Sequence, residues 1–246
     1  MRKISTARLI VAMVSIFFLN LVAQGQSRQE LLGQIENKRA ELQTLQEKFL
    51  APSDGDRSAF SEFLKQPNTG LVRLLPRESF GEVPDKPSKL TIRGGGAYYS
   101  FVRLTHEYGY GSDIELEQNH LRAGFAGADY GIMTMIDEVP LENVTSDLSP
   151  VAFLLGYTPP TEEPEVRQEQ RLFLYAGKMI DGLTYRGRLP VKVNGTYLLR
   201  SISFYNSDVL VAIRIVRKDS DDSLIIAWKL LQKFPKPELI RSTASR

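Results

Sequence analysis

Two long apolar runs near the C-terminal end of the chain constrain its fold more than any other feature. Val209–Val216 and Leu224–Leu231 each contain a single charged residue. A strand with one solvated face alternates apolar and polar side chains, so runs that are apolar almost throughout indicate central strands covered on both faces. The polar segment Arg217–Ser223 between them indicates an antiparallel hairpin. We expect this hairpin to form the core, with a helix at Leu224–Leu231 as the alternative that length and apolarity leave open.

The rest of the chain after residue 89 has the composition of successive strands, because β-branched and aromatic residues gather in short runs between turn formers. The predicted strands are Leu90–Arg93, Ala97–Glu107, Asp113–Gln118, Leu121–Gly127, Gly131–Asp137, Val151–Gly156, Leu172–Gly177, Pro190–Val193, Tyr197–Tyr205, Val209–Lys218 and Ser223–Phe234. In the third of these, alternation predicts a solvated face formed by Asp113, Glu115 and Glu117. We therefore expect a mainly β protein, with one antiparallel β-sandwich or barrel-like domain at residues 90–237 and a polar tail at 238–246.

Residues 1–25 have the organisation of a secretion signal. Basic residues as far as Arg8 precede an uncharged run, which ends in small side chains at Ala23 and Gly25. We expect cleavage after Gly25. The alternative is a retained anchor, because the uncharged run approaches the roughly 20 residues that a membrane-spanning helix needs. In either case the remaining chain is expected to be secreted or periplasmic.

Charge and cysteine content narrow the classes of partner. The chain has 31 basic and 29 acidic residues, and the signal contains three of the basic ones, so the remainder is nearly neutral. We therefore expect no nucleic-acid partner, and membrane contact only if the signal is uncleaved. The absence of cysteine excludes disulfides and lipid attachment at the cleavage site, so stability must come from a buried core.

Residues 26–50 are predicted to form an amphipathic helix with the heptad pattern of a short coiled coil. The apolar a and d residues, which we predict to bind a partner, are Leu31, Ile35, Leu42, Leu45 and Phe49. Arg28 and Lys38 occupy the remaining a and d positions, and their charges weaken the apolar seam that these positions form. A linker at 51–89 follows, with a short helix at Ser58–Gln66 capped by Asp56 and then an extended strap. This separation favours association with a second copy or another envelope protein, and packing on the rest of the chain stays open.

No constellation of residues identifies one reaction or ligand. His106, Glu107 and His120 are weak candidates for a metal site, because two imidazoles and a carboxylate can bind zinc. Their spacing matches no compact metal motif, and a packed, hydrogen-bonded His106 is the simpler interpretation. We predict no cofactor.

Three further features also have structural interpretations that we favour. The glycines at 94–96 and 124–131 lack the strand-to-helix context of a phosphate loop. The acidic turn at Asp219–Asp222 lacks the pattern of a calcium loop and is expected to be a solvated hairpin tip. Tyr98, Tyr108 and Tyr110 are expected to fill the core, with sugar stacking as the alternative.

The sequence therefore predicts an exported, non-catalytic binding or assembly protein of the cell envelope or extracellular space, which associates through its N-terminal helix. The alternatives from other classes are an extracytoplasmic metal-dependent hydrolase and a carbohydrate-binding module. The sequence alone leaves open whether the protein is an enzyme.

Overall fold

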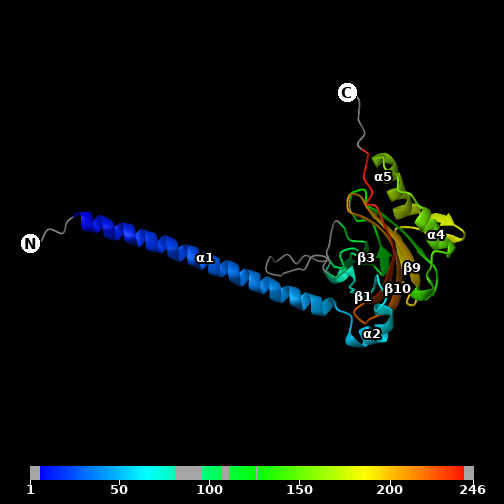
Figure 1. Ribbon diagram of the computed structural model, residues 1–246, viewed down its shortest axis with the longest axis horizontal. Helices are drawn as coiled ribbons and strands as arrows, with labels where there is room; N and C mark the ends of the chain where they lie inside the picture. Colours follow the sequence, from blue (N-terminus) through cyan, green and yellow to red (C-terminus); the bar gives the residue numbers. More distant parts are fainter. Residues whose placement is uncertain (1–5, 81–95, 107–110, 126, 241–246) are drawn as a thin grey trace, which may run out of the picture. The chain divides into compact units, whose positions relative to one another are not determined.

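A computed structural model describes residues 6–80, 96–106, 111–125 and 127–240. The chain divides into two units, Met1–Phe49 and Leu50–Arg246, which are considered separately below as the helix unit and the sheet unit. The described part of the helix unit belongs to α1, Thr6–Leu50, whose last residue lies in the sheet unit, so the helix predicted at residues 26–50 is present (Figure 1). Among the helices of the described chain, none combines the length and apolar character needed to cross a membrane.

The sheet unit is built from antiparallel strands, which confirms the predicted mainly β class. Its larger sheet has the order β1-β11-β10-β9-β5, and a second sheet has the order β2-β3-β4-β8. The strands are β1 Thr69–Leu74, β2 Tyr98–Tyr99, β3 Ile114–Glu117, β4 His120–Arg122, β5 Tyr130–Met135, β6 Lys178–Ile180, β7 Leu183–Tyr185, β8 Arg188–Pro190, β9 Thr196–Ser203, β10 Ser207–Lys218 and β11 Leu224–Phe234. β6 and β7 form a separate hairpin. Neither larger sheet closes on itself within the described residues.

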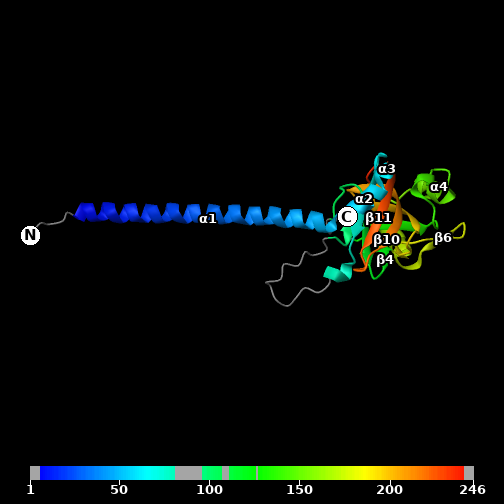
Figure 2. The ribbon, with the colours of Figure 1, turned by 90° about the horizontal axis from the view of Figure 1, so that it is seen from below.

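The long hairpin of β10 and β11 is the centre of the larger sheet, as the two apolar runs predict (Figure 2). Successive side chains of β10 enter different cores, because side chains of a strand alternate between its two faces. Val211 and Ile213 pack in one core, and Leu210 and Ala212 pack in the other. The helical alternative for Leu224–Leu231 is wrong.

The two cores give the sheet unit its layers. The first core joins the larger sheet to the smaller one, through residues such as Ile114 of β3 and Leu121 of β4. The second core joins the opposite face of the larger sheet to α4, Ser149–Gly156, and α5, Glu163–Arg171, through Leu154 and Val166. Figure 1 shows β3 and α4 on opposite sides of β9 and β10.

Two predicted strands are helical in the structure. The segment Val151–Gly156 lies in α4, whose first turn contains Pro150, a residue that suits the start of a helix. The segment Leu172–Gly177 is the π-helical turn η3, Leu172–Ala176, which ends at Gly177 with a φ of 75°. Both are short apolar runs, in which strand and helix periodicities look alike.

Other predicted strands are shorter or fall outside the described residues. Within the described part of the predicted strand at Ala97–Glu107, Tyr98–Tyr99 forms β2 and Ser100 makes an isolated bridge with Thr105. The backbone turns between them, with a φ of 57° at Leu104. The predicted strand Leu90–Arg93 lies outside the described residues.

The predicted linker at 51–89 lies within the sheet unit, and its described part, residues 51–80, has more structure than one short helix. It contains two short helices, α2 Asp54–Ala59 and α3 Ser61–Leu64. Ser53 is the N-cap of α2, and Asp56 is the third helical residue of a capping box rather than the cap itself. Thr69–Leu74 then pairs with β11 as the edge strand β1.

Candidate functional site

The residues predicted to bind a partner lie on one side of α1 and are exposed within the helix unit. Their exposed fractions range from 38% for Leu42 to 63% for Leu45. Leu32, next to the predicted set, is 55% exposed. Single exposed leucines are common on protein surfaces, but a row that repeats at heptad spacing is the feature that coiled-coil partners recognise. We call Leu31, Ile35, Leu42, Leu45 and Phe49 the apolar stripe.

Polar side chains beside the stripe stabilise the helix locally. Lys38 Nζ lies 2.7 Å from a carboxylate oxygen of Glu41, and Arg39 lies 2.9 Å from Glu36. Such pairs, three residues apart, contribute about 0.2–0.5 kcal/mol each to an isolated helix. Lys38 therefore occupies its d position with a neighbouring carboxylate on the same helix.

The two histidines are engaged in separate hydrogen bonds. His106 Nε2 lies 2.8 Å from the carbonyl oxygen of Arg73, and because a carbonyl only accepts, Nε2 carries the proton. The His106 ring contacts Tyr99 edge-on, with centroids 5.1 Å apart, and its burial lowers its pKa. His120 Nδ1 lies 2.7 Å from the carbonyl oxygen of Gln118. His106 is thus packed and hydrogen-bonded, as the simpler interpretation predicted.

The weak metal candidates gain no further support from the structure. Glu107 lies outside the described residues. In the part of the chain that the structure describes, no group of three or more His, Cys, Asp or Glu residues is arranged to hold a metal ion.

The described tyrosine of the predicted aromatic group fills the core. Tyr98 is 3% exposed and packs edge-on against Phe125, with ring centroids 5.4 Å apart. Tyr108 and Tyr110 lie outside the described residues.

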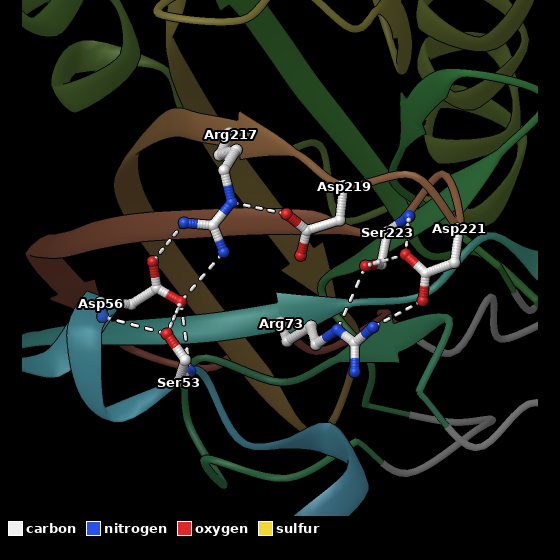
Figure 3. A network of polar contacts seen from close by, with 7 residues as sticks. All are labelled: Ser53, Asp56, Arg73, Arg217, Asp219, Asp221 and Ser223. Atoms are coloured by element: carbon white, nitrogen blue, oxygen red, sulfur yellow. Dashed lines mark hydrogen bonds and ion pairs between the residues drawn. The ribbon is translucent and has the colours of Figure 1, made fainter.

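A network of arginines and carboxylates ties α2 and β1 to the end of the β10–β11 hairpin (Figure 3). Arg217 binds both carboxylate oxygens of Asp56, at 2.5 and 3.1 Å. The Arg217 guanidinium holds the pKa of Asp56 below its ordinary value. Asp56 also accepts a hydrogen bond from Ser53 Oγ at 2.6 Å, which ties the ion pair to the helix cap.

The same network uses two residues of the acidic turn. Arg217 Nε donates to Asp219, and Arg73 Nη2 donates to Asp221 (Figure 3). Arg73 Nε also donates to Ser223 Oγ at 3.1 Å. These aspartates therefore neutralise arginines of the sheet unit, which explains their presence without a bound cation.

The carboxylate face predicted for β3 is not solvated. Asp113 and Glu115 are buried, and only Glu117 is partly exposed. Asp113 accepts hydrogen bonds from Ser201 Oγ and the Phe101 amide, both at 2.7 Å, and burial raises its pKa. Burial also raises the pKa of Glu115, which lies 3.2 Å from Arg77 and 3.5 Å from Arg122. Because the partners of Asp113 come from distant segments, the alternation of β3 alone does not reveal them.

A fully buried ion pair was also not predicted. Arg200 of β9 and Asp208 of β10 are each 2% exposed and form two hydrogen bonds, at 2.6 and 2.8 Å. The Arg200 guanidinium also lies over the Phe234 ring, 3.4 Å from its centroid. Arg200 and Asp208 are eight positions apart in the sequence. The pairing of β9 with β10 brings them together, so the hairpin is the only local feature from which this contact could be predicted.

An open cavity of about 500 Å³ lies beside the acidic turn. Its polar lining is largely engaged within the protein, since Lys218 Nζ binds Asn119 at 3.0 Å and Asp222 at 2.8 Å. The carboxylates of Glu78 and Asp221 in the lining likewise accept hydrogen bonds from the Gln118 amide and from Arg73, so nothing in the cavity points to one ligand.

Comparisons with known proteins add no family to these observations. No protein-family model matches the chain, and no similar protein is found among curated proteins or among solved structures. The functional interpretation therefore depends on the residues described above.

Proposed function

We propose that this chain is an exported, non-catalytic binding or assembly protein of the cell envelope or extracellular space, which associates through α1. The observation that carries the proposal is the apolar stripe, because its side chains are exposed at heptad spacing on a helix that has its own ion pairs. Burying such a row against another helix removes apolar surface from water, which favours association by roughly 25 cal/mol per Å² before the entropic cost is subtracted.

The N-terminal residues support export, since basic residues, an uncharged run and small side chains follow one another in the order of a secretion signal. The features of the sheet unit support a structural role in binding or assembly. Its two larger sheets share one core, so we propose that they form a β-sandwich. The described histidines and the acidic turn make hydrogen bonds or ion pairs within that unit, which supports a structural role for them.

The test compares Leu42→Asp with Asn37→Asp in the exported protein. Both changes introduce one carboxylate into α1, but Leu42 is a seam residue and Asn37 lies at the outward c position. We expect Leu42→Asp to abolish association, measured as mass by sedimentation and as partner recovery after cross-linking in cells. Asn37→Asp should leave both unchanged.

The two readouts are interpreted only if the sheet unit stays folded, which the fluorescence of its buried Trp228 reports. Unchanged mass and unchanged partner recovery in Leu42→Asp would contradict association through the stripe. Export is tested separately by sequencing the N-terminus of the purified protein, which should begin at Gln26. An N-terminus at Met1 would contradict cleavage.

A further inference from the structure

We infer that the partner of the apolar stripe is a second copy of this chain, and that the two α1 helices pair antiparallel about the level of Ala40. This inference rests on the proposed function and goes further by naming the occupant, the orientation and the register. It depends on how the charges next to the stripe meet in the two orientations of a helix pair.

In a parallel pair, each a residue faces the same a residue of the second copy, and each d residue faces the same d residue. Lys38 would then face Lys38 of the second copy. The residue beside it across the seam would be an e residue, Arg39. Four cations would meet in one layer, which is unfavourable because like charges at close range repel.

In an antiparallel pair, a residues face d residues, and the two g edges lie side by side. With Ala40 as the midpoint, Lys38 faces Leu42 of the second copy and lies next to Glu41 on the neighbouring g edge. Each copy already places Lys38 Nζ 2.7 Å from its own Glu41. Two lysines and two glutamates then alternate across the seam, so the layer that is repulsive in a parallel pair becomes electrically balanced.

This register also gives the apolar residues their best partners. Ile35 faces Leu45 of the second copy, and Leu31 faces Phe49, so every member of the stripe enters the seam. A shift by one heptad toward the N-terminus would bring Arg28 into the seam and leave Phe49 outside it. The two e edges also lie side by side in this pair, and there the Arg39 residues of the two copies approach one another.

The Arg39 contact does not cancel the preference, because each Arg39 is paired with Glu36 of its own helix at 2.9 Å. Glu36 is at an outward b position in either orientation, so this pair survives association. The orientation is therefore decided at Lys38, which faces a second Lys38 in the parallel pair and faces Leu42 beside Glu41 in the antiparallel pair.

The antiparallel orientation also links association to export. Two helices held in the same membrane by uncleaved signals would enter it from one side and lie parallel. Antiparallel pairing therefore requires that the segment before residue 26 has been removed, as the small residues Ala23 and Gly25 indicate.

The chain has no cysteine, so disulfide formation between single-cysteine variants reports the orientation without background. Ile35→Cys and Leu45→Cys are purified separately, then incubated with glutathione disulfide alone and as a mixture. We expect a covalent dimer only from the mixture. A second pair of variants, Gln34→Cys and Lys48→Cys, leaves the seam intact and should also give a covalent dimer only as a mixture. The control variant Asn37→Cys, on the outward side of the helix, should remain monomeric on a denaturing gel.

Three results would overturn the inference. Covalent dimers from Ile35→Cys alone and from Leu45→Cys alone would show a parallel pair, in which the two positions are about 15 Å apart along the axis. A dimeric mass with no disulfide from either mixture would exclude this register. A monomeric mass by sedimentation would exclude a second copy as the partner, while recovery of another protein that depends on Leu42 would still support the proposed function.

Discussion

Replacing Asp208 with asparagine tests how much the buried ion pair of the larger sheet contributes to stability. Asp208 and Arg200 are diagonal neighbours across the β9–β10 pair, each 2% exposed, with hydrogen bonds of 2.6 and 2.8 Å. Asparagine has nearly the same shape and keeps one acceptor, but it leaves the Arg200 charge buried without a counterion. Breaking a buried pair in this way costs about 3–5 kcal/mol, a large part of the 5–15 kcal/mol that typically stabilises a domain.

The unfolding of the sheet unit can be followed through Trp228, the only tryptophan of the chain, which packs in the core between the two sheets. With a typical urea dependence of about 2 kcal/mol per M, the loss corresponds to a midpoint lower by on the order of 2 M. The matched control is Asp137→Asn, which breaks an exposed pair with Lys192 at 2.8 Å. The backbone φ of Asp137 is 64°, a conformation that asparagine adopts as readily as aspartate.

The control should shift the urea midpoint much less, because exposed ion pairs contribute little in water. If Asp208→Asn lowers the urea midpoint no more than Asp137→Asn does, the reasoning is refuted, and the Arg200 charge must be stabilised by other groups. The contact of Arg200 with the Phe234 ring, 3.4 Å from its centroid, would then be the first to examine.

Two further predictions concern charges outside that core. Glu41→Lys should weaken self-association about tenfold in sedimentation, because it places four cations at the Lys38 layer of an antiparallel pair. The double variant Lys38→Glu/Glu41→Lys exchanges the two charges and should restore association. Equal weakening in the single and the double variant would contradict the pairing. Asp56→Asn should lower the urea midpoint at neutral pH, because the pKa of Asp56 is held down by Arg217. The contribution of a carboxylate with a lowered pKa is present above its ordinary value near 3.8 and is lost below it, so the two midpoints should converge in acid, and a gap that persists at pH 2 would contradict the ion pair.

The parts of the fold that sequence reasoning predicts are those whose cause is local. The β10–β11 hairpin is predictable because burial on both faces requires apolar residues at successive positions, and that pattern is visible within one run. The prediction of a strand at Val151–Gly156, which lies in α4, is wrong because this run is too short for its periodicity to distinguish a helix from a buried strand. The strand β1 is missed because an edge strand pairs on one side only, here with a segment about 150 residues later.

The buried polar contacts show a second limit of prediction from the sequence. Asp113 is placed on a solvated face by alternation, yet it is buried because Ser201, 88 residues away, and the Phe101 amide satisfy its oxygens. Asp56 and Arg217 are 161 residues apart. A buried carboxylate is stable only where donors converge on it, and that convergence is a property of the completed fold rather than of any local window.

The apolar stripe of α1 is predictable to a greater extent, because its heptad spacing lies within one continuous helix. Lys38 is read from the sequence as a weakness of the seam, and in isolation that reading is correct, since a charged d residue lowers the stability of a helix pair. A seam with leucine there would be more stable but would pair in either orientation. Lys38 beside Glu41 instead penalises the parallel pair and tolerates the antiparallel one. In the antiparallel pair that we propose, the charge that weakens the seam is therefore the feature that specifies how two copies meet.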